Sequence, residues 1–373
     1  MNDIDESAVC IEQHIILIDD DEATMPLDNN NPRRHVQVLP ERVGAVSNSE
    51  FPGHYPGEDH SWSLDKFKEN LVVSVQRLTP STIEFDLVGV DASIANALRR
   101  IMIAEVPTVA IEDVYVWNNT SIMQDEVLAH RVGLVPLKID PRTLDFKPTA
   151  YSAPMETDTH VFDLRIKCER RRDAAPGETD PKKLYHDSNV YTGMMKWAPS
   201  GNQALKYRGR EPKPVLDDIL LVKLRPGQVV DLHCFARKGI GADHAKYSPV
   251  ATASYRLLPH IILRGPIPQE HQEKFKKCFA PGVVEIKKDE HGDNQVVIAN
   301  PRKDTVSREV LRHPEFQDLV ELARIRDHFL FNVESAGQYR PGDLVPEAIK
   351  IMLGKITAVE AGLEKLFASD ASA

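Results

Sequence analysis

The chain has 373 residues, a mass of 41.9 kDa and a formal net charge of −10. The charge is concentrated at one end: residues 1–60 hold 13 acidic and three basic residues, and the remaining 313 residues hold 43 of each. This balanced body excludes a protein that binds nucleic acid through bulk positive charge. At about 150 residues per domain, the body is expected to form roughly two domains.

The cysteine pattern and the apolar runs limit the class of protein further. Cys10, Cys168, Cys234 and Cys278 are widely spaced and form no Cys-x-x-Cys pair, so neither a disulfide framework nor a zinc site of the usual spacing is expected. The first residues are acidic, unlike a secretory signal. No apolar run approaches the ~18 residues of a membrane span. We therefore expect a soluble protein of a reducing compartment, without membrane contact.

Residues 1–60 form an acidic leader. Acidic residues, Asn, Pro and Gly dominate it, and it has too little apolar surface to offset the entropy of ordering, so we expect it to be mostly disordered. One apolar run, 15–18, precedes the acidic run 19–22. It is either a short partner-binding motif or, as we favour, coil that the neighbouring charges protect from aggregation.

Regular patterns begin at residue 71. Apolar residues alternate in residues 71–88 on both sides of Thr79-Pro80-Ser81, which predicts a β-hairpin. Asp91 predicts the N-cap of a helix that ends shortly before Pro107. The apolar face of this helix consists of Ile94, Leu98, Ile101 and Met102. Arg99 and Arg100 project away from that face.

The rest of the body alternates between predicted strands and loops. Strands are expected at 108–117, 160–168, 219–236, 250–263 and 328–334. Long loops are expected over 169–218, because Pro, Gly and charged residues dominate there. The polar stretch 268–325 contains helical patterns at 270–278 and 314–326. A last helix is predicted from Pro346 to about Phe367, after an entry signal at residues 341–343.

The last helix carries a regular apolar seam. Its members follow spacings that alternate between four and three residues: Val345, Ile349, Met352, Ile356, Val359, Leu363 and Leu366. Such a narrow seam suits another helix, and Ile351, Leu353 and Phe367 widen it. Composition favours a terminal helix packed on its own core. The pattern alone leaves both interpretations open.

Several stretches resemble part of a catalytic, phosphate-binding or metal site, but none contains all the residues that such a site needs. The loop 237–244 contains Gly239-x-Gly241 without a third glycine, which indicates a tight turn rather than a phosphate cradle. His244, with Asp243 and Lys246, has no nucleophile beside it. Three further candidates are His233-Cys234 and residues 125–131 as metal ligands, and Arg170-Arg171-Arg172 as a phosphate contact. Because the body contains no Asp-x-Asp-x-Asp run for Mg²⁺, we expect no catalytic, cofactor or metal site.

Several motifs together resemble the α-like subunits of RNA polymerases. Residues 93–107 contain Asn-Ala-Leu-Arg-Arg and look like the first dimerisation helix of that family. Residues 125–137 are similar to the motif that follows it. Tyr247-Ser-Pro-Val and Phe331-Asn-Val-Glu-Ser335, with the helix after it, resemble the returning half. These motifs cover most of the body in the order of the family.

Within the family, the resemblance is greatest to the larger α-like subunits shared by polymerases I and III. Residues 224–228 and 304–312 support this branch. Polymerase II and archaeal relatives often carry a cysteine cluster in the insert that binds zinc or iron–sulfur. Here that region contains Cys168 without a cysteine cluster, so the resemblance does not imply a metal site in this chain.

The resemblance implies an α+β fold. A dimerisation domain of antiparallel sheet and helices would occupy 61–107 and 248–373, and a β-rich insert would occupy 108–247. The helix near residue 100 and the C-terminal seam would then pack against a smaller α-like subunit, with Arg99 and Arg100 facing a large catalytic subunit. The implied partner-interface residues are Ile94, Leu98, Arg99, Arg100, Ile101, Met102, Ile349, Met352, Ile356, Val359 and Leu363.

The implied function is that of a non-catalytic scaffold of polymerases I and III in the nucleus and nucleolus, which make rRNA, tRNA and 5S RNA. The implied partners are the smaller α-like subunit, the largest and second-largest subunits and a small zinc-binding subunit, with little direct DNA contact. Three alternatives remain: the polymerase II counterpart, a free-standing homodimeric interaction module, and an enzyme that uses the 239–244 loop.

Overall fold

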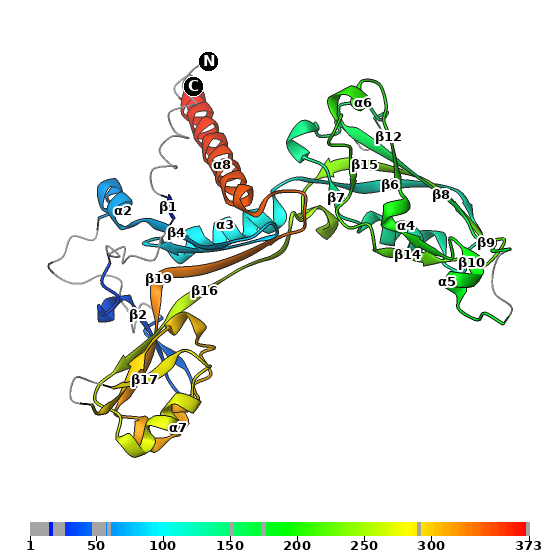
Figure 1. Cartoon of the computed structure of the whole chain (residues 1–373). Coiled ribbons are helices and arrows are strands. Elements are labelled where there is room, and N and C mark those ends of the chain that lie inside the picture. The colour runs from blue at the N-terminus through cyan, green and yellow to red at the C-terminus, as the bar shows by residue number, and fades with distance from the viewer. Residues whose placement is uncertain are drawn as a thin grey trace. The chain divides into compact units, whose positions relative to one another are not determined.

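The structure is a computed structural model that describes residues 15–17, 27–46, 57, 61–149, 152–172, 177–288 and 292–370. The chain divides into two compact units. The first consists of Met1–Arg77, Ile83–Asn96 and Ser254–Asn332, and the second of Leu78–Thr82, Ala97–Ala253 and Val333–Ala373. Both contain sheets and helices (Figure 1), which confirms the predicted α+β class.

The first unit is built on a seven-stranded sheet. Its strands follow the order β1 (Ile15–Leu17), β4 (Val72–Leu78), β5 (Thr82–Val88), β19 (Val320–Ser335), β2 (His35–Val38) and β3 (Val43–Gly44), and β16 (Val250–Leu263) also pairs with β19. β4 and β5 confirm the predicted hairpin. The rings of Phe85 and Phe331 stack 4.9 Å apart on neighbouring strands, so aromatic packing joins the hairpin to β19.

Two helices flank the hairpin in sequence. α2 spans Leu64–Asn70 and α3 spans Ala92–Ala104. The carboxylate of Asp91 accepts a hydrogen bond from the backbone N–H of Ser93 at 2.8 Å, which is the predicted N-cap interaction. The helix ends three residues before Pro107, as expected.

Part of the acidic leader is ordered, contrary to the prediction of disorder. Residues 32–34 form a 3-10 helix, and β2 pairs with β19 from Val38↔Leu322 to His35↔Ile325. The guanidinium of Arg34 donates two hydrogen bonds through Nε and one through Nη2 to the Asp327 carboxylate, at 2.7–3.1 Å. The backbone of 15–17 forms β1, parallel to β4, rather than coil. Of the leader, residues 1–14, 18–26, 47–56 and 58–60 lie outside the described part of the chain.

The stretch 268–325 has its own apolar core. The predicted helix at 270–278 is present as a 3-10 turn, Gln269–His271, followed by α7 (Gln272–Lys277). The predicted helix at 314–326 is wrong: a 3-10 turn at Pro314–Phe316 precedes β19, because the chain extends to pair with β2. The hairpin β17 (Val284–Lys288) and β18 (Asn294–Ile298) was not predicted. Phe275 and Phe316 are fully buried here.

The second unit contains a four-stranded sheet in the order β12 (Lys196–Ala198), β8 (Thr159–Lys167), β15 (Val229–Gly239) and β6 (Thr108–Asn119). α4 (Asp125–Gly133) lies against β6. Leu128 and Val132 of α4 join Phe162 and Leu232 in one core. The predicted strands 108–117 and 160–168 are therefore confirmed.

The stretch 169–218 is not a long loop. It contains β9 (Glu169–Arg170), α5 (Pro181–Leu184), β10 (Tyr185–His186), β11 (Asn189–Tyr191), α6 (Gln203–Lys206) and β13 (Lys213–Pro214). β13 pairs with β7 (Leu137–Lys138) and β11 with β14 (Leu220–Lys223). The predicted strand 219–236 is two strands, β14 and β15, because Gly227 adopts a positive φ of 90° in the turn between them.

The last helix, α8, spans Pro341–Asp370 and begins five residues before the predicted start. Pro346 lies in its second turn, where the ring costs one backbone hydrogen bond but leaves the later turns intact. No helix in the described part of the chain combines the length and the apolar character that crossing a membrane requires.

Candidate interaction surface

The first turns of α8 are fixed to the rest of the second unit. Leu344 and Ala348 are fully buried. The Tyr339 hydroxyl, just before the helix, donates a hydrogen bond to the carbonyl of Pro107 at 2.9 Å. The Arg142 guanidinium lies 3.7 Å from the carboxylates of both Asp343 and Glu347. Apolar burial and ion pairs therefore hold the start of the helix in place.

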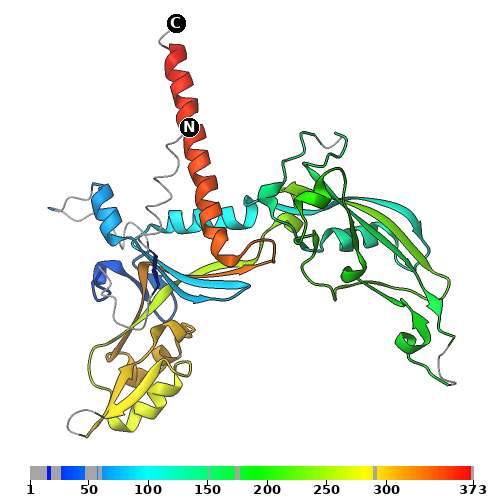
Figure 2. The same ribbon diagram turned by 45° about the horizontal axis from the view of Figure 1, so that its top comes forward.

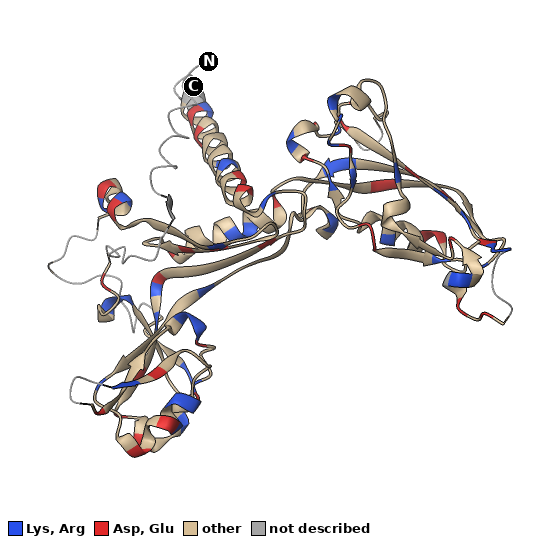
Figure 3. Cartoon of the chain, in the orientation of Figure 1, with Lys and Arg blue, Asp and Glu red and all other residues tan. Residues whose placement is uncertain are grey.

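The second half of α8 exposes the predicted seam. Ile349 and Met352 are half-buried, and every residue from 353 to 367 is exposed. The exposed fractions are 55% for Ile356, 65% for Val359, 49% for Leu363 and 62% for Leu366. In Figures 1 and 2 this half is the red end of the long helix, and in Figure 3 most of it is uncharged. Solvent-exposed apolar residues in such a row indicate a surface that another protein covers.

One ion pair fixes the junction between the two halves. The ammonium of Lys355 donates to the carboxylate of Glu105 at 2.6 Å, and Glu105 is the residue directly after the last residue of α3. This contact places the C-terminal end of α3 beside the point where α8 becomes exposed. Sequence reasoning missed Glu105, Arg142, Tyr339 and Lys355, because their contacts join residues far apart in the chain and leave no local pattern.

The predicted interface residues of α3 lie in different environments. Leu98, Ile101 and Met102 are buried within this chain, with exposed fractions of 7%, 5% and 0%. Ile94 and Arg99 are half-buried, and Arg100 is exposed. Direct contact with another protein is therefore available to Ile94, Arg99 and Arg100, whereas the three buried side chains support the helix from behind.

A cluster of charged groups joins β6, β15 and the 3-10 turn Ala245–Tyr247. The Glu112 carboxylate accepts hydrogen bonds from Lys246, from Arg237 at 2.9 Å and from the Tyr247 hydroxyl at 2.8 Å. Burial opposes ionisation of Glu112, but the hydrogen bonds from Lys246, Tyr247 and Arg237 hold its pKa at about 2. The second carboxylate, that of Asp113, lies 3.9 Å from the Arg237 guanidinium, so two cations face two anions, which suits a structural junction.

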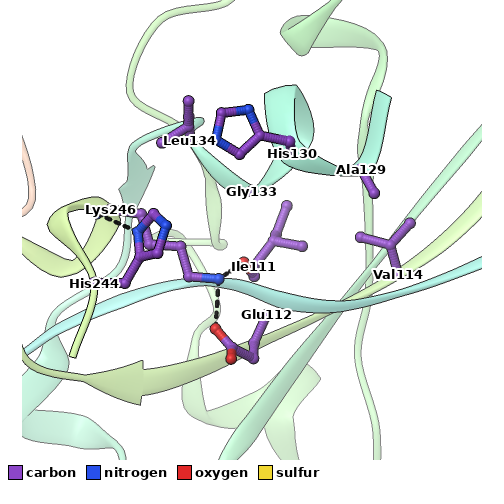
Figure 4. A pocket seen from close by; sticks show the side chains of 9 residues that line it. All are labelled: Ile111, Glu112, Val114, Ala129, His130, Gly133, Leu134, His244 and Lys246. Carbon is purple, nitrogen blue, oxygen red and sulfur yellow. Dashed lines mark hydrogen bonds and ion pairs between the residues drawn. The ribbon is translucent and has the colours of Figure 1, made fainter. Parts of the chain in front are cut away.

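Two motifs that are separate in the sequence line one cavity of about 220 Å³ (Figure 4). His130 of α4 and His244 face it from different elements. Nδ1 of His244 accepts the backbone N–H of Lys246 at 3.1 Å, and the Lys246 ammonium pairs with Glu112. The nine residues that line the cavity include no Ser, Thr or Cys, so no hydroxyl or thiol nucleophile lies beside His244.

The glycines of the 237–244 loop serve the turn that the sequence predicted. Gly239 ends β15, and the backbone N–H of Asp243 bonds to the carbonyl of Ile240 at 3.1 Å. A Cβ on Gly241 would lie 2.2 Å from the carbonyl oxygen of Ile103. Close approach of two backbones, rather than a bound phosphate, therefore explains the glycine.

The remaining candidate metal ligands do not converge. His233 and Cys234 are successive residues of β15 and point to opposite faces of the sheet. His233 lies 2.5 Å from Asp163, and Cys234 is fully buried, which raises the pKa of its thiol to about 12. No group of three His, Cys, Asp or Glu side chains within the described ranges is arranged to hold a metal ion.

The structure thus combines an α+β fold with a last helix that is fixed at one end and exposes an apolar row at the other. The chain belongs to the family of the RNA polymerase Rpb3/Rpb11 dimerisation domain, which matches residues 84–356. The resemblance seen in the sequence motifs is thereby confirmed.

The relatives favour one branch of this family. The "DNA-directed RNA polymerases I and III subunit RPAC1" of Bos taurus is 50% identical over 313 residues, covering 84% of this chain and 90% of that protein. The subunit of the same name from Saccharomyces cerevisiae is 47% identical, and the match covers 84% of this chain and 94% of that protein. The "DNA-directed RNA polymerase II subunit rpb3" of Dictyostelium discoideum is 32% identical, and the match covers 77% of this chain and 93% of that protein.

Proposed function

We propose that the chain is a non-catalytic assembly subunit of DNA-directed RNA polymerases I and III. The observation that carries this proposal is the exposed apolar row at the distal end of α8. The names of the RPAC1 relatives support the assignment to polymerases I and III, since their identity of 47–50% to this chain exceeds the 32% of the polymerase II relative.

The proposed partner of the helical surface is a smaller α-like subunit. Its helices would cover the apolar row of α8, together with Ile94 of α3. Arg99 and Arg100 would face a large catalytic subunit, because the fixed fork of a guanidinium suits carboxylates and backbone carbonyls. The contact set on α8 is Ile349, Met352, Ile356, Val359 and Leu363.

The heterodimer would nucleate docking of the two large catalytic subunits and of a small zinc-binding subunit. The electrically balanced body suits a scaffold with little direct contact with DNA. The assembled enzymes would act in the nucleus and nucleolus, in the synthesis of rRNA, tRNA and 5S RNA. In this proposal residues 61–107 and 248–373 form the dimerisation domain and residues 108–247 form the insert.

The experiment compares two variants of the full-length chain that place the same charge on opposite sides of α8. Ile356→Asp introduces a carboxylate into the exposed apolar row, and Ala361→Asp introduces one five residues later, about 140° around the helix. Burying an unpaired charge in an interface costs several kcal/mol. We expect Ile356→Asp to lose the small partner on affinity purification, and Ala361→Asp to retain it. The co-purifying chains are identified and quantified by mass spectrometry.

The outcomes separate the proposal from its alternatives. Co-purification of the largest subunits of polymerases I and III supports it, and co-purification of the polymerase II counterpart contradicts it. A stable homodimer of the chain expressed alone would indicate a free-standing module. Retention of the small partner by Ile356→Asp would contradict the assignment of the surface.

A further inference from the structure

A second surface lies at the end of the insert that carries β9, β11 and α5, and it is independent of α8. A groove of about 460 Å³ runs between the turn after β6, the start of α5 and the paired strands β11 and β14. Asn189 and Lys223 face each other across that strand pair in register. Nothing in the proposed heterodimer contact uses these residues.

The groove has an apolar edge that packing within the chain does not explain. Ile122 is 93% exposed and lines the groove beside Pro181 and the buried Leu224. No other large apolar side chain among the described residues is so exposed. A single exposed aliphatic side chain is common on protein surfaces, but at the rim of this groove Ile122 adds apolar area that a segment seated in the groove would cover.

The opposite edge of the groove carries two cations, Lys223 and Arg225, against one carboxylate in the lining, that of Asp180. Lys223 and Arg225 are exposed, and no described carboxylate lies within ion-pair distance of either one. The Arg225 guanidinium lies over the Tyr185 ring, 6.0 Å from its centroid, and Tyr185 pairs in register with the exposed Arg170. Figure 3 shows basic and acidic residues interspersed at this end of the insert. Both cations, Lys223 and Arg225, therefore face the groove without an ion pair to a described carboxylate.

Neutral hydrogen-bonding groups lie between these two edges. Ser188, Asn189 and Gln228 line the groove. The side-chain oxygen of Gln228 accepts the backbone N–H of Arg225 at 2.7 Å, which leaves its amide N–H groups to donate. The acidic residue of the lining, Asp180, caps α5 through its backbone carbonyl. The groove thus offers cations and donors beside an apolar rim.

We propose that this groove docks an extended segment of another protein in which acidic side chains flank an apolar one. The acidic side chains would pair with Lys223 and Arg225, and the apolar side chain would cover Ile122. A nucleic acid strand fits less well, because phosphate binding depends on many cations along the backbone and leaves an aliphatic rim uncovered.

The test places the photoreactive residue p-benzoylphenylalanine at Ile122 in the full-length, tagged chain, which is irradiated in cells and purified as its native assembly. We expect an adduct with one segment of another protein, and peptide mapping should show Asp or Glu on both sides of the attachment point. The matched control carries the same photoreactive residue at Leu205 of α6, which is 74% exposed but does not line the groove. It should give no such adduct.

The charge requirement is tested in the Ile122 photoreactive background. Lys223→Glu with Arg225→Glu should reduce the adduct about tenfold or more, because like charges then face each other. Lys196→Glu with Lys213→Glu changes the net charge equally outside the groove and should leave the adduct unchanged. Lys223→Gln with Arg225→Gln gives the same test if the reversed pair fails to fold.

Four outcomes would overturn the proposal: no adduct at Ile122, an adduct with nucleic acid, an adduct with a segment that lacks acidic residues, or an adduct that the charge reversal leaves intact. Each is independent of the fate of the α8 surface, because Ile356→Asp removes the small partner without altering the groove.

Discussion

The two halves of α8 continue one apolar pattern into opposite environments. In the first turns, Leu344 and Ala348 are fully buried and ion pairs hold the helix from the side. In the second half, the row from Ile356 to Leu366 is exposed. The same chemistry therefore stabilises this chain at one end of the helix and is available to another chain at the other end.

This difference shows what helical periodicity establishes. A row of apolar residues at spacings of three and four predicts that one face of a helix is covered, but it does not say by which molecule. Only the tertiary structure separates the residues covered by this chain from those left exposed. The boundary lies near Lys355, whose ion pair with Glu105 joins α8 to the residue that follows α3.

The largest expected effect is a difference between the two halves of α8 in how much a leucine contributes to the free energy of unfolding. Leu344→Ala removes a fully buried side chain and should lower the free energy of unfolding by about 2–5 kcal/mol. Leu363→Ala removes the same atoms from an exposed site and should change it by about 0.5 kcal/mol or less. Urea denaturation of the two full-length variants measures both. Equal losses of unfolding free energy in the two variants would contradict the exposure of the distal row, because they would show that this chain buries Leu363.

A smaller effect is expected from the ion pairs of the first turns. Arg142→Ala removes the cation that lies near both Asp343 and Glu347, at a cost of about 1 kcal/mol or less for exposed pairs. Amide hydrogen exchange should become faster in residues 344–348 and stay unchanged in residues 356–366. Lys350→Ala, which removes another partner of Glu347, serves as the control. Faster exchange along the whole helix would show that the halves are not independent.

The sequence predicted elements whose pattern is local and long. The N-cap at Asp91, the strands at 108–117 and 160–168 and the terminal helix each carry their period within their own residues. The α+β class and the family followed from these elements and from motifs in the correct order. The apolar row of α8 was visible for the same reason.

The sequence did not predict elements that depend on distant partners. The four residues of β2 are a strand only because they pair with residues 322–325, almost 300 positions later. The stretch 314–326 has a helical pattern, but its apolar residues are used by a strand that packs on that distant partner. Likewise, the groove beside Ile122 gathers residues from four separate segments, so no local spacing reveals it.

The smallest expected effect is a pH dependence that arises from Asp140, which holds Arg142 beside the first turns of α8. Burial opposes ionisation of Asp140, but hydrogen bonds from the Arg142 guanidinium and backbone lower its pKa from the usual 3.8. Because the folded pKa lies below the unfolded one, this contribution is present above pH 3.8 and is lost as the pH falls through the folded value.

Asp140→Asn removes that contribution at every pH. The difference in thermal stability between the natural chain and this variant should therefore be largest near neutral pH and should shrink below about pH 4, by less than 1 kcal/mol in all because the group is partly exposed. Comparing the two proteins at each pH cancels the titration of the other carboxylates. The same comparison, made on binding of the small partner with Ile356 intact, should show no dependence on Asp140, since the distal row binds through apolar side chains. A difference that persists at low pH would show that Asp140 positions Arg142 by hydrogen bonding alone, without its charge.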